Sequence, residues 1–128
     1  MEFLTLRPDA ARSGVTSDVA TVGDWVFIAG QGPIDLDDDR TPLPEMVEAQ
    51  TLKVLANAET LLRRVGLARG HLVSVRVFIV NFPRFAERVN EAYREFFAGG
   101  RLPVRTCVGV SHLTRGALVE MDFVAHRG

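Results

Sequence analysis

The sequence predicts an α+β domain in which two amphipathic helices cover one face of a β-sheet. Segments with every second residue apolar, the pattern of half-buried strands, occur before, between and after two segments with helical spacing. The predicted order is β-β-α-β-α-β-β, with an additional short edge strand over residues 3–7. Because the chain has 128 residues and no repeat or linker, one domain spanning residues 1–128 is expected.

The sheet is predicted to begin with a hairpin. Residues 18–22 and 25–29 are rich in β-branched and aromatic side chains, and Gly23-Asp24 between them suits a two-residue turn. The Gly-Gln-Gly-Pro segment at 30–33 ends the second strand. The acidic run at 35–39 lacks the Gly and the closing Glu that a calcium-binding loop needs, so a solvated loop is expected.

Two helices and the strand between them are predicted for the middle of the chain. From about residue 44 to 65 the apolar positions follow helical spacing, and Gly66 is a natural stop. The second helix fits residues 83–97, with Asn81 as its N-cap. Residues 72–80 alternate between apolar and polar, which predicts a strand.

The last two strands, residues 103–110 and 118–125, are predicted to pair as an antiparallel hairpin because a short linker joins them. This register would place Arg105 opposite Asp122, with Glu120 on the diagonal of the same face. A guanidinium and two carboxylates on one face can hold an anionic substrate and position a water. The same residues also suit a solvated cross-strand ion pair, which would contribute only about a few tenths of a kcal/mol.

The sheet face opposite the helices is predicted to be mixed in character. It would carry charged residues such as Arg76 and Glu120, apolar ones such as Phe78 and Val124, and also Arg105 with Cys107. Such a face is too apolar to remain fully hydrated and too charged to be a closed core. Association with other subunits is therefore expected.

Composition excludes several classes of function. The formal net charge is -1 and the basic residues are scattered, so neither nucleic acid nor an anionic membrane is an expected partner. The single cysteine, Cys107, permits no intramolecular disulfide, and the three histidines have no metal-ligand spacing. With no basic, apolar leader or membrane span evident, a cytoplasmic location is expected.

A set of motifs occurs in one order along nearly the whole chain. They comprise Val26–Gln31, Gln50-Thr51, Asn57, Val89–Phe97, Pro103–Val108 and Val119–Asp122. The specific part is Pro-x-Arg-x-Cys-Val followed by a glutamate thirteen residues beyond the cysteine. In this ordered set the chain resembles the RidA (YjgF) family of reactive-intermediate deaminases.

The resemblance implies a chorismate-mutase-like fold assembled as a homotrimer with three clefts between subunits. Family members hydrolyse imines and enamines, such as 2-iminobutanoate and 2-aminoacrylate, to 2-oxo acids and ammonia, without a metal or organic cofactor. By motif position Arg105 would bind the substrate carboxylate, and Glu120 would hold the attacking water with the backbone of Gly30. The backbone carbonyl of Cys107 would meet the imine nitrogen, and Asn90 would line the substrate pocket.

Two positions depart from the family pattern. Ala29 stands where these deaminases usually have Ser, and Thr16 where they usually have Tyr. Both usual side chains would line the cleft, so the pocket of this chain is expected to be wider and its substrate different. Two other functions remain open: a trimer that binds a small carboxylate without catalysis, and an endoribonuclease, an activity attributed to some relatives. The net charge argues against the endoribonuclease.

Overall fold

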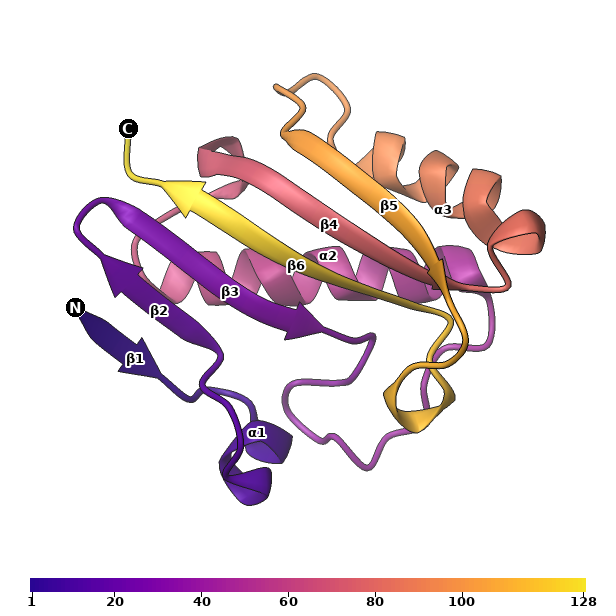
Figure 1. Ribbon diagram of the computed structural model, residues 1–128, viewed down its shortest axis with the longest axis horizontal. Coiled ribbons are helices and arrows are strands. Elements are labelled where there is room, and N and C mark those ends of the chain that lie inside the picture. The colour runs from indigo at the N-terminus through magenta and orange to yellow at the C-terminus, as the bar shows by residue number, and fades with distance from the viewer.

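The protein is a six-stranded sheet with its two long helices on one face, in a computed structural model that describes residues 1–128 (Figure 1). In chain order the elements are β1 (Glu2–Leu4), α1 (Pro8–Ser13), β2 (Val19–Val22), β3 (Trp25–Gln31), α2 (Val47–Arg64), β4 (Leu72–Val80), α3 (Phe82–Phe96), β5 (Val104–Val110) and β6 (Val119–His126). Short 3-10 turns precede β4 and β6. The α+β class predicted from the sequence is confirmed.

The strands lie in the order β1-β2-β3-β6-β4-β5. β4 and β5 are parallel, and every other neighbouring pair is antiparallel. The predicted hairpin about Gly23-Asp24 is confirmed, with Val22 opposite Trp25. The predicted edge strand near the N-terminus is also present, as the three-residue β1.

The predicted hairpin between the last two strands is wrong. β5 pairs only with β4, at the edge of the sheet, whereas β6 lies between β3 and β4. The reason is that α3 connects β4 to β5 in the same direction, which makes a parallel β-α-β crossover. After β5 the chain turns at residues 114–116 and continues as β6, which lies between β3 and β4. Alternate residues of β6 are fully buried there.

The helices cover one sheet face and form the core with it. α2 and α3 lie behind the sheet in Figure 1, and the inward residues of β3, β4 and β6 pack against them. α2 begins at Val47 rather than at Pro44, whose carbonyl instead accepts a 2.8 Å hydrogen bond from the Gln50 side chain. Asn81 is the N-cap residue of α3, as predicted, but it is left-handed, with φ 54°, and its side chain makes no capping hydrogen bond.

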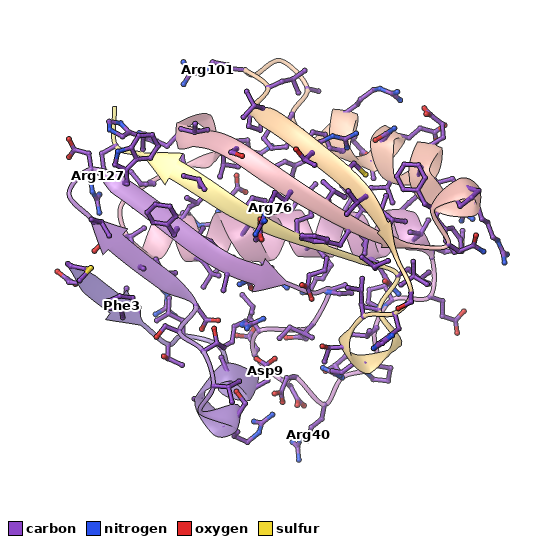
Figure 2. The ribbon with its side chains drawn as sticks, in the orientation of Figure 1. Phe3, Asp9, Arg40, Arg76, Arg101 and Arg127 are labelled. Carbon is purple, nitrogen blue, oxygen red and sulfur yellow. The ribbon has the colours of Figure 1, made fainter.

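The other sheet face carries no helix and keeps large apolar side chains exposed. We call it the open face. Arg76 stands near its centre in Figure 2. Its exposed apolar residues are Phe3, Val22, Trp25, Phe27, Val104 and Val108. An apolar surface of this extent is typical of an association surface. None of the helices has the length and apolar character that crossing a membrane requires.

The short helix α1 was not anticipated from the sequence. It has only six residues, too few for a helical period to emerge, and its start is set by Arg7 in an extended conformation followed by Pro8. Figure 1 shows α1 at the same end of the sheet as the loop after β3 and the turn before β6. This end of the sheet contains Gly30 and Glu120.

Candidate functional site

Arg105 and Glu120 project from opposite faces of the sheet. In the parallel pairing of β4 with β5, Arg105 lies beside Val75, which is fully buried under the helices. Glu120 lies opposite Phe78, whose position alternates with the buried residues of β4 and is on the open face. The prediction that Arg105, Cys107 and Glu120 share one face is therefore wrong, because it depended on a hairpin that does not form.

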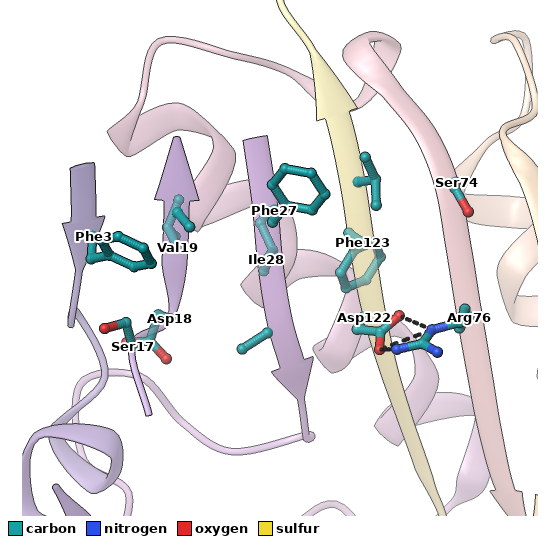
Figure 3. A pocket seen from close by; sticks show the side chains of 13 residues that line it. Phe3, Ser17, Asp18, Val19, Phe27, Ile28, Ser74, Arg76, Asp122 and Phe123 are labelled. Atoms are coloured by element: carbon teal, nitrogen blue, oxygen red, sulfur yellow. Dashed lines mark hydrogen bonds and ion pairs between the residues drawn. The ribbon is translucent and has the colours of Figure 1, made fainter. Parts of the chain in front are cut away.

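The partner of Asp122 is Arg76, not Arg105. Arg76 lies directly opposite Asp122 on β4 and binds it with two hydrogen bonds, Nε to Oδ1 at 2.9 Å and Nη2 to Oδ2 at 2.6 Å (Figure 3). The pair raises the pKa of Arg76 further. The solvated cross-strand ion pair that the sequence left open thus exists, but with a different arginine, and it leaves Arg105 without a carboxylate partner.

Glu120 rests against the backbone of Gly30, where the pairing of β3 with β6 is interrupted. A Cβ at Gly30 would lie 2.6 Å from Oε2 of Glu120, so only glycine lets the carboxylate approach this closely. Both residues line a cavity of about 180 Å³, together with Arg7 and Arg115. Burial raises the pKa of Glu120, while the charge of Arg7 lowers it and that of Asp122 raises it.

Arg105 forms a second cluster at the opposite edge, between β5 and α3. Its guanidinium carbon lies 4.8 Å from the centroid of the Tyr93 ring. The Tyr93 hydroxyl and the Oδ1 atom of Asn90 are buried and have no hydrogen-bond partner. Because such groups are costly to bury unpaired, they offer unused hydrogen-bonding capacity next to Arg105. Tyr93 was not singled out from the sequence, where its helical spacing suggested only a core residue.

Cys107 lies next to this cluster, half-buried on the same face as Arg105. Burial raises the pKa of its thiol, and the nearby charge of Arg105 only partly opposes this. The thiol therefore stays protonated at neutral pH and is a poor nucleophile. Since β5 is an edge strand, alternate backbone carbonyls along it remain free to accept a hydrogen bond.

Neither of the two positions that depart from the family pattern lines the cavity of Gly30 and Glu120, although Ala29 adjoins Gly30 in the chain. Thr16 is exposed, and its hydroxyl donates to the carbonyl of Ser17 at 2.8 Å. Ala29 lines a hollow of about 520 Å³ on the open face, shared with Phe27, Arg76 and Asp122 (Figure 3). The predicted residues thus lie in four places within one chain: Gly30 with Glu120, Arg105 with Cys107 beside α3, Ala29 on the open face, and Thr16 in an exposed position.

Comparison with known proteins identifies the family. The model of the family described as Endoribonuclease L-PSP matches residues 7–127, nearly the whole chain. The chain belongs to the YjgF/RidA/RutC family. The resemblance inferred from the sequence motifs is thereby confirmed.

Named members of the YjgF/RidA/RutC family are similar over most of their length. A RutC family protein of Pyrococcus abyssi is 34% identical over 114 residues, which cover 89% of this chain and 87% of that protein. The 2-iminobutanoate/2-iminopropanoate deaminase of Salmonella typhimurium is 32% identical over 108 residues, 83% of this chain and 82% of the deaminase. The crystal structure of E. coli TdcF with bound serine superposes with a TM-score of 0.81 at 29% identity, covering 88% of each chain.

Proposed function

We propose that the protein hydrolyses small 2-imino acids and their enamine tautomers, such as 2-iminobutanoate and 2-aminoacrylate, to 2-oxo acids and ammonia. The observation that carries the proposal is that one chain holds two complementary half-sites. One offers a free guanidinium beside unpartnered polar atoms, and the other a half-buried carboxylate against the backbone of Gly30. Family membership and the similarity to a 2-iminobutanoate/2-iminopropanoate deaminase support the same chemistry.

The two half-sites can meet only between chains, because they lie on opposite faces of the sheet. We therefore propose a homotrimer in which Arg105, Cys107 and Asn90 of one subunit face Glu120 and Gly30 of another. The apolar open face supports association, since it leaves Phe27, Val108 and other large side chains exposed in the isolated chain.

In this site the substrate carboxylate binds Arg105 through two parallel hydrogen bonds, which fix the orientation of a very small molecule. Glu120 accepts a proton from a water as the water oxygen attacks the protonated imine carbon, giving a carbinolamine. Glu120 returns that proton to the nitrogen. The carbon–nitrogen bond then breaks with its electron pair leaving on ammonia, while Glu120 takes the hydroxyl proton and passes it to solvent, so that the 2-oxo acid forms. The backbone carbonyl of Cys107 accepts a hydrogen bond from the nitrogen, and no cysteine nucleophile is required.

The electrostatics of Glu120 suit this role. Because burial raises the pKa of Glu120, its carboxylate is a stronger base than that of an exposed glutamate. Activity is expected to fall as the pH drops through this raised pKa, since the protonated acid cannot accept a proton from water. The acid limb of the pH profile should therefore lie above the usual range of a glutamate.

A second candidate, binding without catalysis, is favoured by one observation. Thr16 and Ala29 replace the usual cleft Tyr and Ser, while the carboxylate anchor Arg105 is retained. The E. coli TdcF structure contains serine, a small carboxylate. An endoribonuclease receives no such support, because the net charge is -1 and the basic residues are scattered along the sequence.

A coupled assay tests the proposal. A pyridoxal-phosphate-dependent threonine or serine dehydratase supplies the imine, semicarbazide competes for it, and 2-oxo acid formation is followed with and without the protein. We expect the wild type to accelerate oxo-acid release and Glu120→Gln to lose at least about 100-fold of this activity, the contribution of general-base catalysis. Calorimetry should show that the variant still binds a 2-oxo acid through Arg105. If neither protein accelerates release yet both bind, the binding function is correct.

A further inference from the structure

A buried ion pair joins the N-terminal segment to the start of the sheet. Nε of Arg7 donates to Oδ1 of Asp18 at 2.5 Å, and the two side chains are only 10% and 0% exposed. The second oxygen of Asp18 accepts the backbone N–H groups of Leu6 and Arg7 at 2.6 and 2.7 Å. With all these bonds made, the carboxylate holds the guanidinium in one orientation.

From this fixed position Arg7 reaches the Glu120 half-site. Its Nη1 donates to the carbonyl of Gly30 at 3.3 Å, and Gly30 is the residue against which the Glu120 carboxylate rests. Arg7 also lines the same cavity of about 180 Å³ as Glu120. The contacts form a continuous chain from Asp18 through Arg7 to Gly30 and Glu120.

Other charged groups around Glu120 do not replace Arg7. Asp122, on the same strand, opposes the ionised form and is itself paired with Arg76. Asp9 of α1 and Arg115 of the turn before β6 also face the cavity. Arg115 is exposed and turns toward the carbonyl of Thr41, whereas Arg7 is the cation whose charge acts on the Glu120 carboxylate.

We propose that Arg7 is a positioning residue of the Glu120 half-site: held by Asp18, it orients the Gly30 carbonyl that helps to bind the water, and it keeps a positive charge in the cavity of the Glu120 carboxylate. This inference rests on the proposed function. It adds that the N-terminal segment, which the sequence offered only as an edge strand, is part of the reaction machinery. In this proposal Arg7 acts through Gly30 and Glu120 rather than on the substrate.

The first test removes the Arg7–Asp18 pair without leaving the fully buried Asp18 carboxylate unpaired. Asp9, which lies 3.7 Å from Nε of Arg7, is 35% exposed and keeps contact with water. In Arg7→Met/Asp18→Asn the asparagine oxygen can still accept the two backbone N–H groups. The titration of the Glu120 carboxyl is followed by carbon-13 NMR and assigned by its loss in Glu120→Gln. We expect its midpoint to move to higher pH, because a stabilising cation has been removed. The matched control Arg88→Met/Glu48→Gln removes an ion pair between α2 and α3 and should leave the midpoint unchanged.

The second test separates the role of Arg7 in orienting the Gly30 carbonyl from its electrostatic role at Glu120. In Arg7→Lys the single ammonium keeps the charge and the bond to Asp18 but cannot also reach Gly30. We expect the titration midpoint of Glu120 to stay near that of the wild type while kcat falls by about 10-fold and KM changes little. The double variant should lose about 100-fold in kcat, with its acid limb displaced to higher pH.

These outcomes decide the proposal separately from the deaminase function. An unchanged Glu120 midpoint in a folded double variant would overturn the electrostatic role. A wild-type kcat in Arg7→Lys would overturn the orienting role, and this variant decides it even if the double variant does not fold. If the wild type has no deaminase activity, the proposed function fails, while the NMR titration still shows whether Arg7 controls Glu120.

Discussion

At the scale of single residues, the position of the Glu120 carboxylate depends on the absence of a side chain at Gly30. The carboxylate occupies the space that a Cβ would take, at 2.6 Å from its expected position. Gly30→Ala should therefore displace Glu120. Because the end of a flexible side chain moves aside at small cost, we expect the free energy of unfolding to change by less than about 1 kcal/mol, while turnover falls by about 100-fold.

The matched control is Gly32→Ala, two residues along the same segment. A Cβ there would meet nothing within 4 Å, so we expect both stability and turnover to stay near the wild-type values. Chemical denaturation and the coupled assay measure the two quantities. Equal activity in Gly30→Ala and Gly32→Ala would show that the close approach of Glu120 to Gly30 does not matter for the reaction.

Arg105 is predicted to act through the paired N–H groups of its planar guanidinium, and not through its charge alone. Arg105→Lys keeps the charge but loses one of two parallel hydrogen bonds to the substrate carboxylate. We expect kcat/KM to fall by about 10- to 100-fold, the cost of one charge-assisted hydrogen bond. Arg94→Lys, the same change at an exposed arginine of α3 paired with Glu87, is the control and should leave kcat/KM unchanged. Wild-type turnover in Arg105→Lys would remove this residue from the site.

At the scale of elements, alternation along the sequence predicts strands well but not their partners. The segments that became β4, β5 and β6 were each recognised, because apolar residues two apart mark a buried face. Because α3 is long enough to carry the chain back to the start of β4, β5 runs parallel to β4. β6 then lies between β3 and β4. The alternation of apolar and polar residues is the same in a parallel edge strand as in a strand of a hairpin. The sequence pattern therefore does not distinguish the two pairings, and the predicted hairpin places Arg105 on the wrong face.

Only those site residues that lie in sequence motifs can be predicted from the sequence. Arg105, Glu120 and Gly30 lie in the motifs Pro103–Val108, Val119–Asp122 and Val26–Gln31, so the sequence alone predicts them as site residues. Arg7 and Asp18 carry no such signal: they are eleven residues apart and meet only when α1 folds back against the sheet. A buried ion pair of this kind becomes visible only in three dimensions.

Asn57 of α2 is predicted to support the segment that follows β3. This buried side chain donates to the carbonyls of Gly32 and Ile34 at 3.2 and 2.8 Å. Asn57→Ala leaves a buried carbonyl unpaired, so we expect a loss of about 1–3 kcal/mol in the free energy of unfolding. Thr60→Ala, on the same helix but off the core, should cost less than about 0.5 kcal/mol. Urea denaturation measures both, and equal losses would contradict this role for Asn57.

At the scale of the whole molecule, the half-sites and the open face imply the same assembly. Arg105 cannot approach Glu120 within a chain, because the sheet separates them. The open face presents apolar side chains that water solvates poorly, and in the proposed trimer their burial between subunits would also bring half-sites of different chains together. Assembly and catalysis should therefore be lost together when this face is made polar.

Phe27→Asp tests this coupling. Phe27 is 45% exposed at the open face, where a carboxylate would have to be buried in the interface and would also face Asp122 across the same hollow. We expect light scattering at micromolar concentration to give a trimer mass for the wild type and a monomer mass for the variant. Deaminase activity should fall in proportion to the trimer that remains.

Met46→Asp makes a similar change at a residue 55% exposed before α2, away from the open face, and should leave mass and activity intact. A monomeric wild type would contradict the shared site, and so would a monomeric Phe27→Asp that keeps full activity, because a single chain would then suffice for the reaction.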